Sequence, residues 1–202
     1  MTDLYKTVEK KSEGIFRDRG SKFIALAFPV NSEDEIKTIQ KQLRSEYYDA
    51  RHHCFAWRLG AEKTHYRVND DGEPSGSSGL PIYGQIQSFD LTNILVVVIR
   101  YFGGTKLGIP GLINAYRTAT AEAFKAAKII EKTVNDIFEL DFEYESMNDV
   151  MKIIKDEGVE QFDQVFEMRC SLKITIRKSE TERITERFKK IDKLQCKYLH
   201  TE

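Results

Sequence analysis

The chain has 202 residues, of which 41% are hydrophobic and 31% are charged, and its net charge is −1. This composition excludes a disordered protein, and no apolar run approaches the roughly 20 residues that a membrane-spanning helix needs. The near-neutral charge excludes a strongly basic nucleic-acid binder, although residues 1–132 carry a net charge of +3 and residues 133–202 a net charge of −4. Any contact with nucleic acid is therefore expected to be local.

The N-terminus and the cysteines predict a cytoplasmic protein. Residues 1–6, Met-Thr-Asp-Leu-Tyr-Lys, lack the basic and then apolar layout of a signal peptide. Cys54, Cys170 and Cys196 are an odd number at unrelated spacings, with no Cys-x-x-Cys motif. We expect reduced thiols and neither a metal nor a cofactor.

The first part of the chain predicts strands at residues 21–30, about 52–59, 64–68 and 93–101. A helix capped by Asn31 or Ser32 follows the first strand, because its acidic first turn suits the helix dipole. A short helix is expected from Pro81. The β-branched run over 93–101 is typical of a strand buried on both faces. One apolar stripe predicts a long helix after the last strand: Ile109, Leu112, Ile113, Tyr116, Thr120, Ala123, Phe124 and Ala127.

The remaining chain predicts the order β-α-β-β-α-β, with strands at 137–144, 159–166, 168–177 and 194–199. Ser146 and Ser179 are the expected helix caps, and Gly158 is the expected end of the first helix. This order is that of ferredoxin-like domains, so we expect two domains, residues 1–132 and 133–202. In the first strand one face is expected to be apolar (Phe138, Leu140, Phe142 and Tyr144) and the other acidic, which disfavours RNA there.

Two loops hold most of the glycine and proline: eight of twelve glycines and three of four prolines fall between Gly72 and Gly111. We name residues 69–81 the first loop and residues 100–111 the second loop. Glycine serves where φ is positive or where another group approaches the backbone closely, so we expect the two loops to meet in one concave site. Each loop precedes a predicted helix whose N-terminus would favour an anion, although neither contains a Walker A motif. The alternative is that the glycines only permit tight packing.

Charged residues in these loops leave several alternatives open. Asp70, Asp71 and Glu73 would repel a phosphate unless a divalent cation intervenes. Alternatively, they pair with Arg100 or Lys106 across the two loops. The third alternative is that they are solvent-exposed turn residues. We predict that the ligand-binding residues are Asp71, Glu73, Ser75, Gly76, Arg100, Gly103, Gly104, Lys106 and Gly108.

The sequence Arg51-His52-His53-Cys54 is the other candidate for chemistry. On a strand, His52 and Cys54 share a face and His53 points to the opposite one. A histidine can activate a cysteine nucleophile, but an inert buried cysteine is the more common outcome in an apolar strand. We therefore expect Cys54 to be structural.

Three motifs resemble the YigZ/IMPACT family: DARHHCFAW over residues 49–57, DDGEPSG over 70–76, and VIRYFGG over 98–104 followed by Leu107-Gly108. The family has Thr-Ala where this chain has Ser77-Ser78, and often glycine in place of Pro110. The resemblance implies an N-terminal α/β two-layer domain of the ribosomal-protein/GHMP-kinase-like superfold. It also implies a C-terminal ferredoxin-like domain resembling one in elongation factor G.

Eukaryotic members of this family are associated with regulating translation, and nucleic-acid binding has been suggested for bacterial ones. We therefore expect a translation-associated protein that contacts RNA or a protein partner through the first domain. The alternatives are an enzyme that acts on a phosphate-bearing small molecule held between the loops, and a protein-interaction module without a ligand. The basic residues near the loops that could contact RNA are Arg51, Arg67, Arg100, Lys106 and Arg117.

Overall fold

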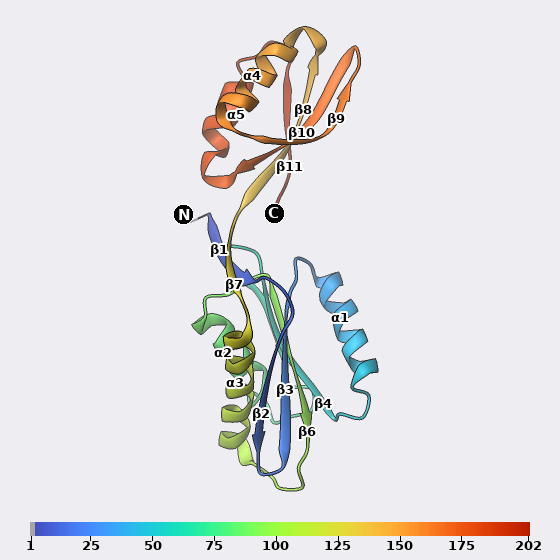
Figure 1. The fold of residues 1–202 in the computed structure, drawn as a ribbon, viewed down its shortest axis with the longest axis vertical. Helices are drawn as coiled ribbons and strands as arrows, with labels where there is room; N and C mark the ends of the chain where they lie inside the picture. The colour runs from blue at the N-terminus through green and yellow to red at the C-terminus, as the bar shows by residue number, and fades with distance from the viewer. Residues whose placement is uncertain (1–2) are drawn as a thin grey trace. The chain divides into compact units, whose positions relative to one another are not determined.

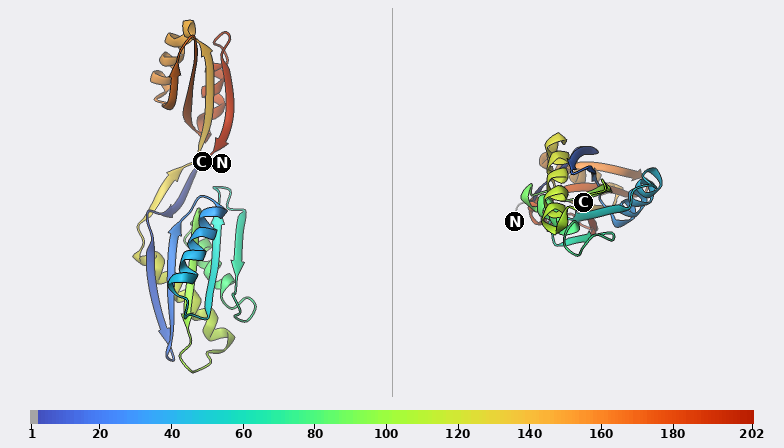
Figure 2. Two further views of the ribbon diagram at one scale, coloured as in Figure 1. Left: turned by 90° about the vertical axis from the view of Figure 1, so that its right-hand side faces the viewer. Right: turned by 90° about the horizontal axis from the view of Figure 1, so that it is seen from below.

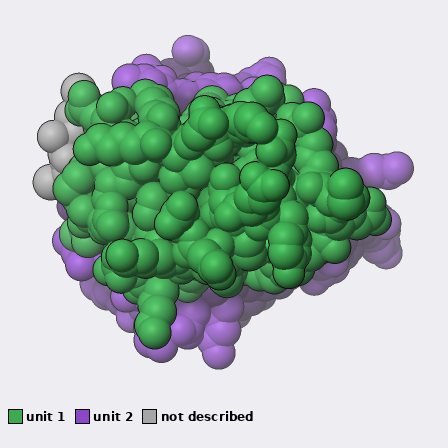
Figure 3. Space-filling view, turned by 90° about the horizontal axis from the view of Figure 1, so that it is seen from above, with its two compact units in different colours: residues 1–4, 133–202 green, residues 5–132 purple. Residues whose placement is uncertain are grey.

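The computed structural model describes residues 3–202, which divide into two compact units (Figures 1 and 3). Residues 5–132 form the N-terminal unit, and residues 133–202 together with Asp3 and Leu4 form the C-terminal unit. None of the helices in the described part of the chain is long and apolar enough to cross a membrane.

The N-terminal unit is built on a five-stranded antiparallel sheet of order β2-β3-β6-β4-β5. Its central strand β6 (Ile94–Tyr101) is buried on both faces along almost its whole length, as the β-branched run predicts. The other strands are β2 (Ser12–Asp18), β3 (Ser21–Pro29), β4 (His52–Leu59) and β5 (His65–Asn69).

Helices cover both faces of this sheet, so the prediction of a two-layer domain is wrong. α1 (Glu33–Glu46), capped by Ser32, packs Ile36 and Leu43 on one face. α2 (Gly79–Ser88) and α3 (Gly108–Ala126) cover the opposite face. In Figure 2 the blue helix α1 lies in front of the sheet and the yellow-green α3 behind it. The physical reason is that β3, β4 and β6 are apolar on both sides and need two covering layers.

Three strands were not expected from the sequence. β1 (Leu4–Val8) and β7 (Ile129–Thr133) pair in a two-stranded sheet, and β2 forms an edge of the larger sheet. α3 crosses β2 closely at Gly14, where an added Cβ would lie 2.1 Å from the backbone nitrogen of Ala123. Glycine is required there because no side chain fits between strand and helix.

The C-terminal unit has the predicted element order, β8-α4-β9-β10-α5-β11. Its antiparallel sheet has the strand order β11-β8-β10-β9, and one face packs on α4 and α5. Figure 1 shows both helices on the same side of the sheet. The bounds are β8 (Asn135–Glu143), α4 (Met147–Glu157), β9 (Glu160–Phe166), β10 (Arg169–Arg177), α5 (Thr181–Phe188) and β11 (Gln195–Thr201).

Some local predictions in this unit need correction. Ser146 and Ser179 lie in short 3₁₀ turns, and neither side chain caps the helix that follows. Tyr144 lies in the first of these turns and is largely exposed, because β8 ends at Glu143. Gly158 ends α4 at φ +61°, as predicted.

Candidate functional site

The two loops meet at a pocket of about 450 Å³ in the N-terminal unit. The first loop contributes Glu73 and Pro74, while the second loop supplies much of the wall. Arg51 and His52 line the pocket where β4 begins. The remaining lining residues are Arg100, Phe102, Lys106, Leu107, Gly108, Ile109 and Leu112. The structure therefore confirms that the loops form one concave site.

A buried ion pair joins the two loops at this pocket. Nη1 of Arg100 donates to Oε1 of Glu73 over 2.5 Å, and the two side chains are only 7% and 4% exposed. The hydroxyl of Tyr116 in α3 donates to the same oxygen over 2.8 Å. This confirms the predicted pairing of an acidic residue of the first loop with Arg100. Because removing one partner of such a pair leaves a buried charge, the pair fixes the relative position of the loops.

The guanidinium of Arg100 contacts two aromatic rings. Its Cζ lies 5.5 Å from the ring centroid of Phe23 and 5.7 Å from that of Phe102. Both contacts are within cation–π range. Nε of Arg100 is buried and has no hydrogen-bond partner among residues 3–202. Arg100 thus keeps donor capacity that its contacts within the protein do not use.

The carboxylate of Asp70 occupies the N-terminus of α2. It accepts backbone hydrogen bonds from Gly76, Ser78 and Gly79 at 2.8–3.0 Å, and one from the Ser78 hydroxyl at 2.6 Å. Burial alone would raise the pKa of Asp70, but these hydrogen bonds together hold it below its ordinary value. The expectation of an anion site at Ser77-Ser-Gly79 therefore needs correction, because the protein's own carboxylate fills it.

Asp71 lies away from the pocket and joins the first loop to α1 and β4. It accepts from Nη2 of Arg44 at 2.8 Å and from the backbone nitrogen of His53 at 2.6 Å. Burial raises its pKa, but these two donors outweigh that effect and lower it overall. The backbone oxygen of Asp71 lies 2.8 Å from Nδ1 of His52.

Of the nine predicted ligand-binding residues, the pocket brings together Glu73, Arg100, Lys106 and Gly108. Ser75 and Gly76 are not among its lining residues, nor are Asp71, Gly103 and Gly104. Gly103 packs against the backbone at the β2–β3 turn, where an added Cβ would lie 1.9 Å from the carbonyl carbon of Gly20. Close packing explains this glycine. The binding role of all nine residues stays a prediction.

The N-terminus of α3 opens on the pocket. Gly108 and Ile109, its first two residues, line the pocket, and the N-cap residue Leu107 makes no side-chain capping bond. The first amides of a helix have no partner within the helix, so they are available to an anion. Lys106 and Arg51 are exposed here, and neither forms an ion pair within the described chain.

Cys54 is a buried part of the core. Its thiol donates to the backbone oxygen of Asp70 at 3.0 Å and lies 3.3 Å from the Tyr116 hydroxyl. Burial raises the pKa of Cys54 to about 12, so the thiolate is scarce at neutral pH. This supports the structural role expected for it. Burial also lowers the pKa of His53, which lines a small cavity with Arg44 on the α1 side of the sheet.

The acidic residues of the first loop do not converge on a common point. Asp70 bonds to α2, Asp71 to Arg44 and β4, and Glu73 to Arg100 and Tyr116. Within residues 3–202 no three His, Cys, Asp or Glu side chains are grouped so that they could hold a metal ion. The loop therefore uses its negative charge to fix its own conformation.

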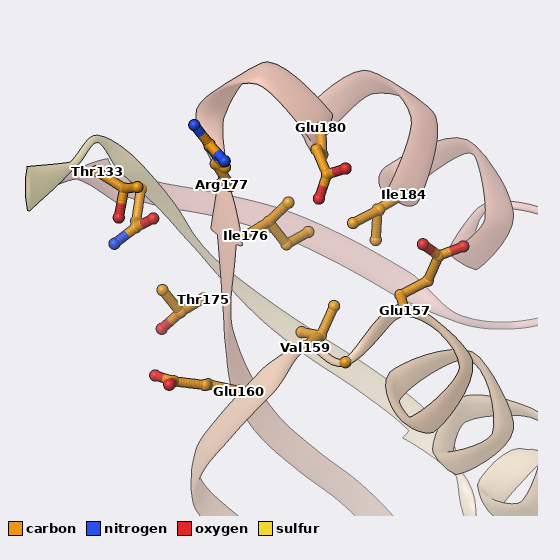
Figure 4. A pocket seen from close by; sticks show the side chains of 11 residues that line it. Thr133, Glu157, Val159, Glu160, Thr175, Ile176, Arg177, Glu180 and Ile184 are labelled. Atoms are coloured by element: carbon orange, nitrogen blue, oxygen red, sulfur yellow. The ribbon is translucent and has the colours of Figure 1, made fainter. Parts of the chain in front are cut away.

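A second pocket, of about 220 Å³, lies within the C-terminal unit (Figure 4). Val159, Ile176 and Ile184 form its apolar part, and Glu157 and Glu180 approach it from the helical side. Glu157 is bound by Arg183 and Arg187, so its charge is neutralised locally. The first pocket combines cations with free backbone donors and is the stronger candidate.

Sequence reasoning missed the role of Tyr116. The apolar stripe of α3 places it correctly in the core, where it is fully buried. Its hydroxyl, however, connects Glu73 with Cys54. The residue type could have indicated this role, because the hydroxyl of a buried tyrosine usually has a hydrogen-bond partner. Ile109, expected in the same stripe, instead lines the pocket and is 53% exposed.

The Impact N-terminal domain family matches residues 19–124, more than half of the chain, so the chain belongs to the IMPACT family. The IMPACT family member YvyE of Bacillus subtilis is 32% identical over 71% of this chain. That match covers 66% of YvyE, so the chain spans just under two thirds of that relative. An IMPACT family member of Haemophilus influenzae is 30% identical, over 80% of this chain and 81% of the relative.

The fold also has a solved counterpart. A crystal structure described as that of a hypothetical protein is similar over 99% of both chains, with a TM-score of 0.75 and 23% sequence identity. At this level of sequence identity, the similarity is evidence for a shared fold alone.

Proposed function

We propose that this protein acts in the regulation of translation by binding RNA at the pocket between the two loops. Membership of the IMPACT family favours a translation-associated role. The pocket supports RNA as the partner, because it combines cationic side chains with free helix amides. Phosphate contacts of this kind provide much of the affinity of RNA-binding proteins.

The observation that carries the proposal is the position of Phe102. This side chain is 48% exposed, lines the pocket and lies over Arg100. Lys106 and Arg51 line the same pocket. An exposed aromatic ring beside cations is the arrangement with which proteins stack unpaired bases and hold their phosphates. Single-stranded RNA is therefore the expected form.

The test is a titration of labelled single-stranded RNA with the full chain at several salt concentrations. Each phosphate contact contributes roughly 0.7 to the log–log salt slope, so contacts from the two unpaired cations, Arg51 and Lys106, predict a slope of roughly −1.4. Lys106→Ala should weaken binding and reduce the magnitude of the slope by about 0.7. Lys41→Ala is the matched control, since Lys41 is exposed on α1, on the other face of the sheet. No binding even at low salt would overturn the proposal and favour a protein partner.

A second candidate is an enzyme acting on a phosphate-bearing small molecule. Its support is the pocket volume of about 450 Å³, which falls in the range of small-ligand sites. Release of phosphate from a set of phosphate esters, lost in Lys106→Ala and kept in Lys41→Ala, would favour this candidate over RNA binding alone.

The domain assignment belongs to the same proposal. We assign residues 1–132 to an IMPACT-type N-terminal domain and residues 133–202 to a ferredoxin-like domain, apart from Asp3 and Leu4, which belong to the C-terminal unit. The antiparallel strand order β11-β8-β10-β9 with both helices on one face supports the second assignment. The three free cysteines support a cytoplasmic location.

A further inference from the structure

The charge of the pocket favours a doubly charged anion. Arg51 and Lys106 are exposed and form no ion pair within the described chain, while the charge of Arg100 is balanced by Glu73. Two positive charges are thus left without a partner. An internal phosphodiester of RNA carries one negative charge, whereas a phosphomonoester carries about −1.5 to −2 at pH 7. The pocket therefore matches a terminal phosphate better than an internal one.

Arg100 provides the second argument. Its side chain is more than nine-tenths buried and lines the pocket, and Nη1 is its only group with a hydrogen-bond partner among residues 3–202, namely Glu73. Nε is buried without a partner among residues 3–202. Nε and Nη2 lie on one edge of a guanidinium, and this edge is the fork that binds two oxygens of a phosphate group. Glu73 holds Nη1, on the other side of the group, so a ligand that enters the pocket would find the Nε–Nη2 edge without a partner among residues 3–202.

The walls of the pocket indicate what the phosphate is attached to. Apolar side chains, Phe102, Leu107, Ile109 and Leu112, surround the cationic groups together with Pro74. A flat aromatic base fits such walls, because it can stack on Phe102 and contact the aliphatic side chains. Inorganic phosphate would leave this apolar surface unused.

We propose that the pocket recognises a terminal phosphomonoester on a nucleoside, held by Arg100, Lys106, Arg51 and the free amides of α3. This inference rests on the proposed RNA-binding function and specifies its ligand. The same chemistry occurs at the 5′-phosphorylated end of an RNA and in a free mononucleotide. The RNA end is the expected source if the strand beyond the first nucleotide adds contacts.

The experiment compares two short RNAs of one sequence, labelled at the 3′ end, with either a 5′-phosphate or a 5′-hydroxyl. The full chain should bind the phosphorylated RNA about tenfold more tightly or better, the effect of one charge-assisted hydrogen bond. AMP should displace this RNA and adenosine should not. Tighter binding of the phosphorylated RNA than of AMP identifies the RNA end as the source, and equal binding identifies the free nucleotide.

Three variants test the residues. Lys106→Ala and Arg51→Ala should each reduce the preference for the 5′-phosphate, and Lys41→Ala should leave it unchanged. Arg100→Lys keeps the positive charge but removes the guanidinium fork, so the preference for the 5′-phosphate should fall. The fluorescence spectrum of the buried Trp57 reports whether this variant is folded. If Arg100→Lys does not fold, the other two variants decide the matter.

Two results would overturn the inference in different ways. Equal binding of both RNAs would refute recognition of the terminal phosphate and leave the RNA-binding function standing. Absence of binding by both RNAs at low salt would refute the RNA-binding function, and absence of binding by AMP as well would refute the inference too.

Discussion

The two units differ in how deeply they bury their ion pairs. In the N-terminal unit the loop carboxylates are turned inward, and the Glu73–Arg100 pair is almost fully buried. In the C-terminal unit most pairs lie at the surface, as with Arg169 and Asp141, whose side chains are 66% and 38% exposed. Buried pairs lose hydration and constrain geometry, whereas exposed pairs contribute little. The difference indicates that the first unit fixes the conformation of a site, while the second uses charge mainly for its surface.

The composition of the first loop explains why its carboxylates are turned inward. The first loop has positive φ at Asp71, Gly72 and Gly76 and few apolar side chains to anchor it. Asp70 and Glu73 take over that role by bonding to α2 and to Arg100. Their hydrogen bonds replace the apolar packing that the loop lacks.

The largest effect is expected from breaking the buried pair. Glu73→Ala leaves Arg100 buried without a counter-charge and should destabilise the N-terminal unit by roughly 3–5 kcal/mol. Trp57, the single tryptophan, is buried in this unit, so its fluorescence during urea unfolding reports on this unit selectively. Glu13→Ala, at an exposed position of β2, is the control and should stay within about 0.5 kcal/mol.

A double-variant cycle sharpens this prediction. Because Glu73 and Arg100 share one interaction, the double variant Glu73→Ala/Arg100→Ala should lose clearly less stability than the sum of the two single variants. Additive losses, or an unchanged curve for Glu73→Ala, would show that the pair does not hold the loops.

The second-largest loss of stability is expected when the carboxylate of Asp70 is removed. Removing its carboxylate in Asp70→Ala takes four hydrogen bonds from the start of α2 and should cost about 2 kcal/mol, the upper range for a helix cap. Trp57 fluorescence measures this loss as well. A loss below about 0.5 kcal/mol would contradict the capping role.

The pH dependence gives an independent check on Asp70. Its pKa is lowered in the folded protein, so the unfolded chain binds a proton first as the pH falls. The stability from Asp70 is thus fully present well above pH 3.8 and is lost as the pH falls below that value. The difference in stability between the wild type and Asp70→Ala should shrink between pH 6 and pH 3. A difference independent of pH would assign the effect to packing.

The sequence predicts long, strongly patterned elements well and short edge strands poorly. The run over β6 and the stripe of α3 are unambiguous because burial selects their residue types. β1 and β7 have only five residues each, and β2 carries three charged residues, so their patterns resemble that of a loop. The two-layer architecture that the family resemblance implies is wrong, because β3, β4 and β6 are apolar on both faces and each face needs its own helical layer.

The site, like the fold, was predictable only where the local sequence pattern is unambiguous. The pairing of Glu73 with Arg100 follows from two oppositely charged loops that flank one strand. The inward turn of Asp70 does not, because an acidic residue beside glycine is equally typical of a solvent-exposed turn. The hydrogen bond between Tyr116 and Glu73 joins residues far apart in the sequence. It depends on how α3 packs against the sheet, and no local sequence pattern shows that packing.

A smaller effect is expected from the Tyr116 hydroxyl. Tyr116→Phe keeps the ring, which packs edge-on against Phe23 at a centroid distance of 5.1 Å, and removes the hydrogen bond to Glu73. Glu73 still has Arg100, so the cost should be about 1.5 kcal/mol, the low end for a hydrogen bond to a charged group. The control Tyr48→Phe changes a largely exposed tyrosine and should have no effect on Trp57-monitored unfolding.

The smallest effect is expected from an exposed pair of the C-terminal unit. Asp141→Asn keeps the shape of the side chain and removes the charge that Nε of Arg169 contacts at 2.5 Å. Because both side chains are hydrated, stability should change by about 0.5 kcal/mol or less, and this change should vanish in 1 M salt. Trp57 does not lie in this unit, so far-UV circular dichroism is the suitable measurement. A loss above about 2 kcal/mol that persists in high salt would place a structurally required ion pair in the C-terminal unit too, and the contrast between the two units would no longer hold.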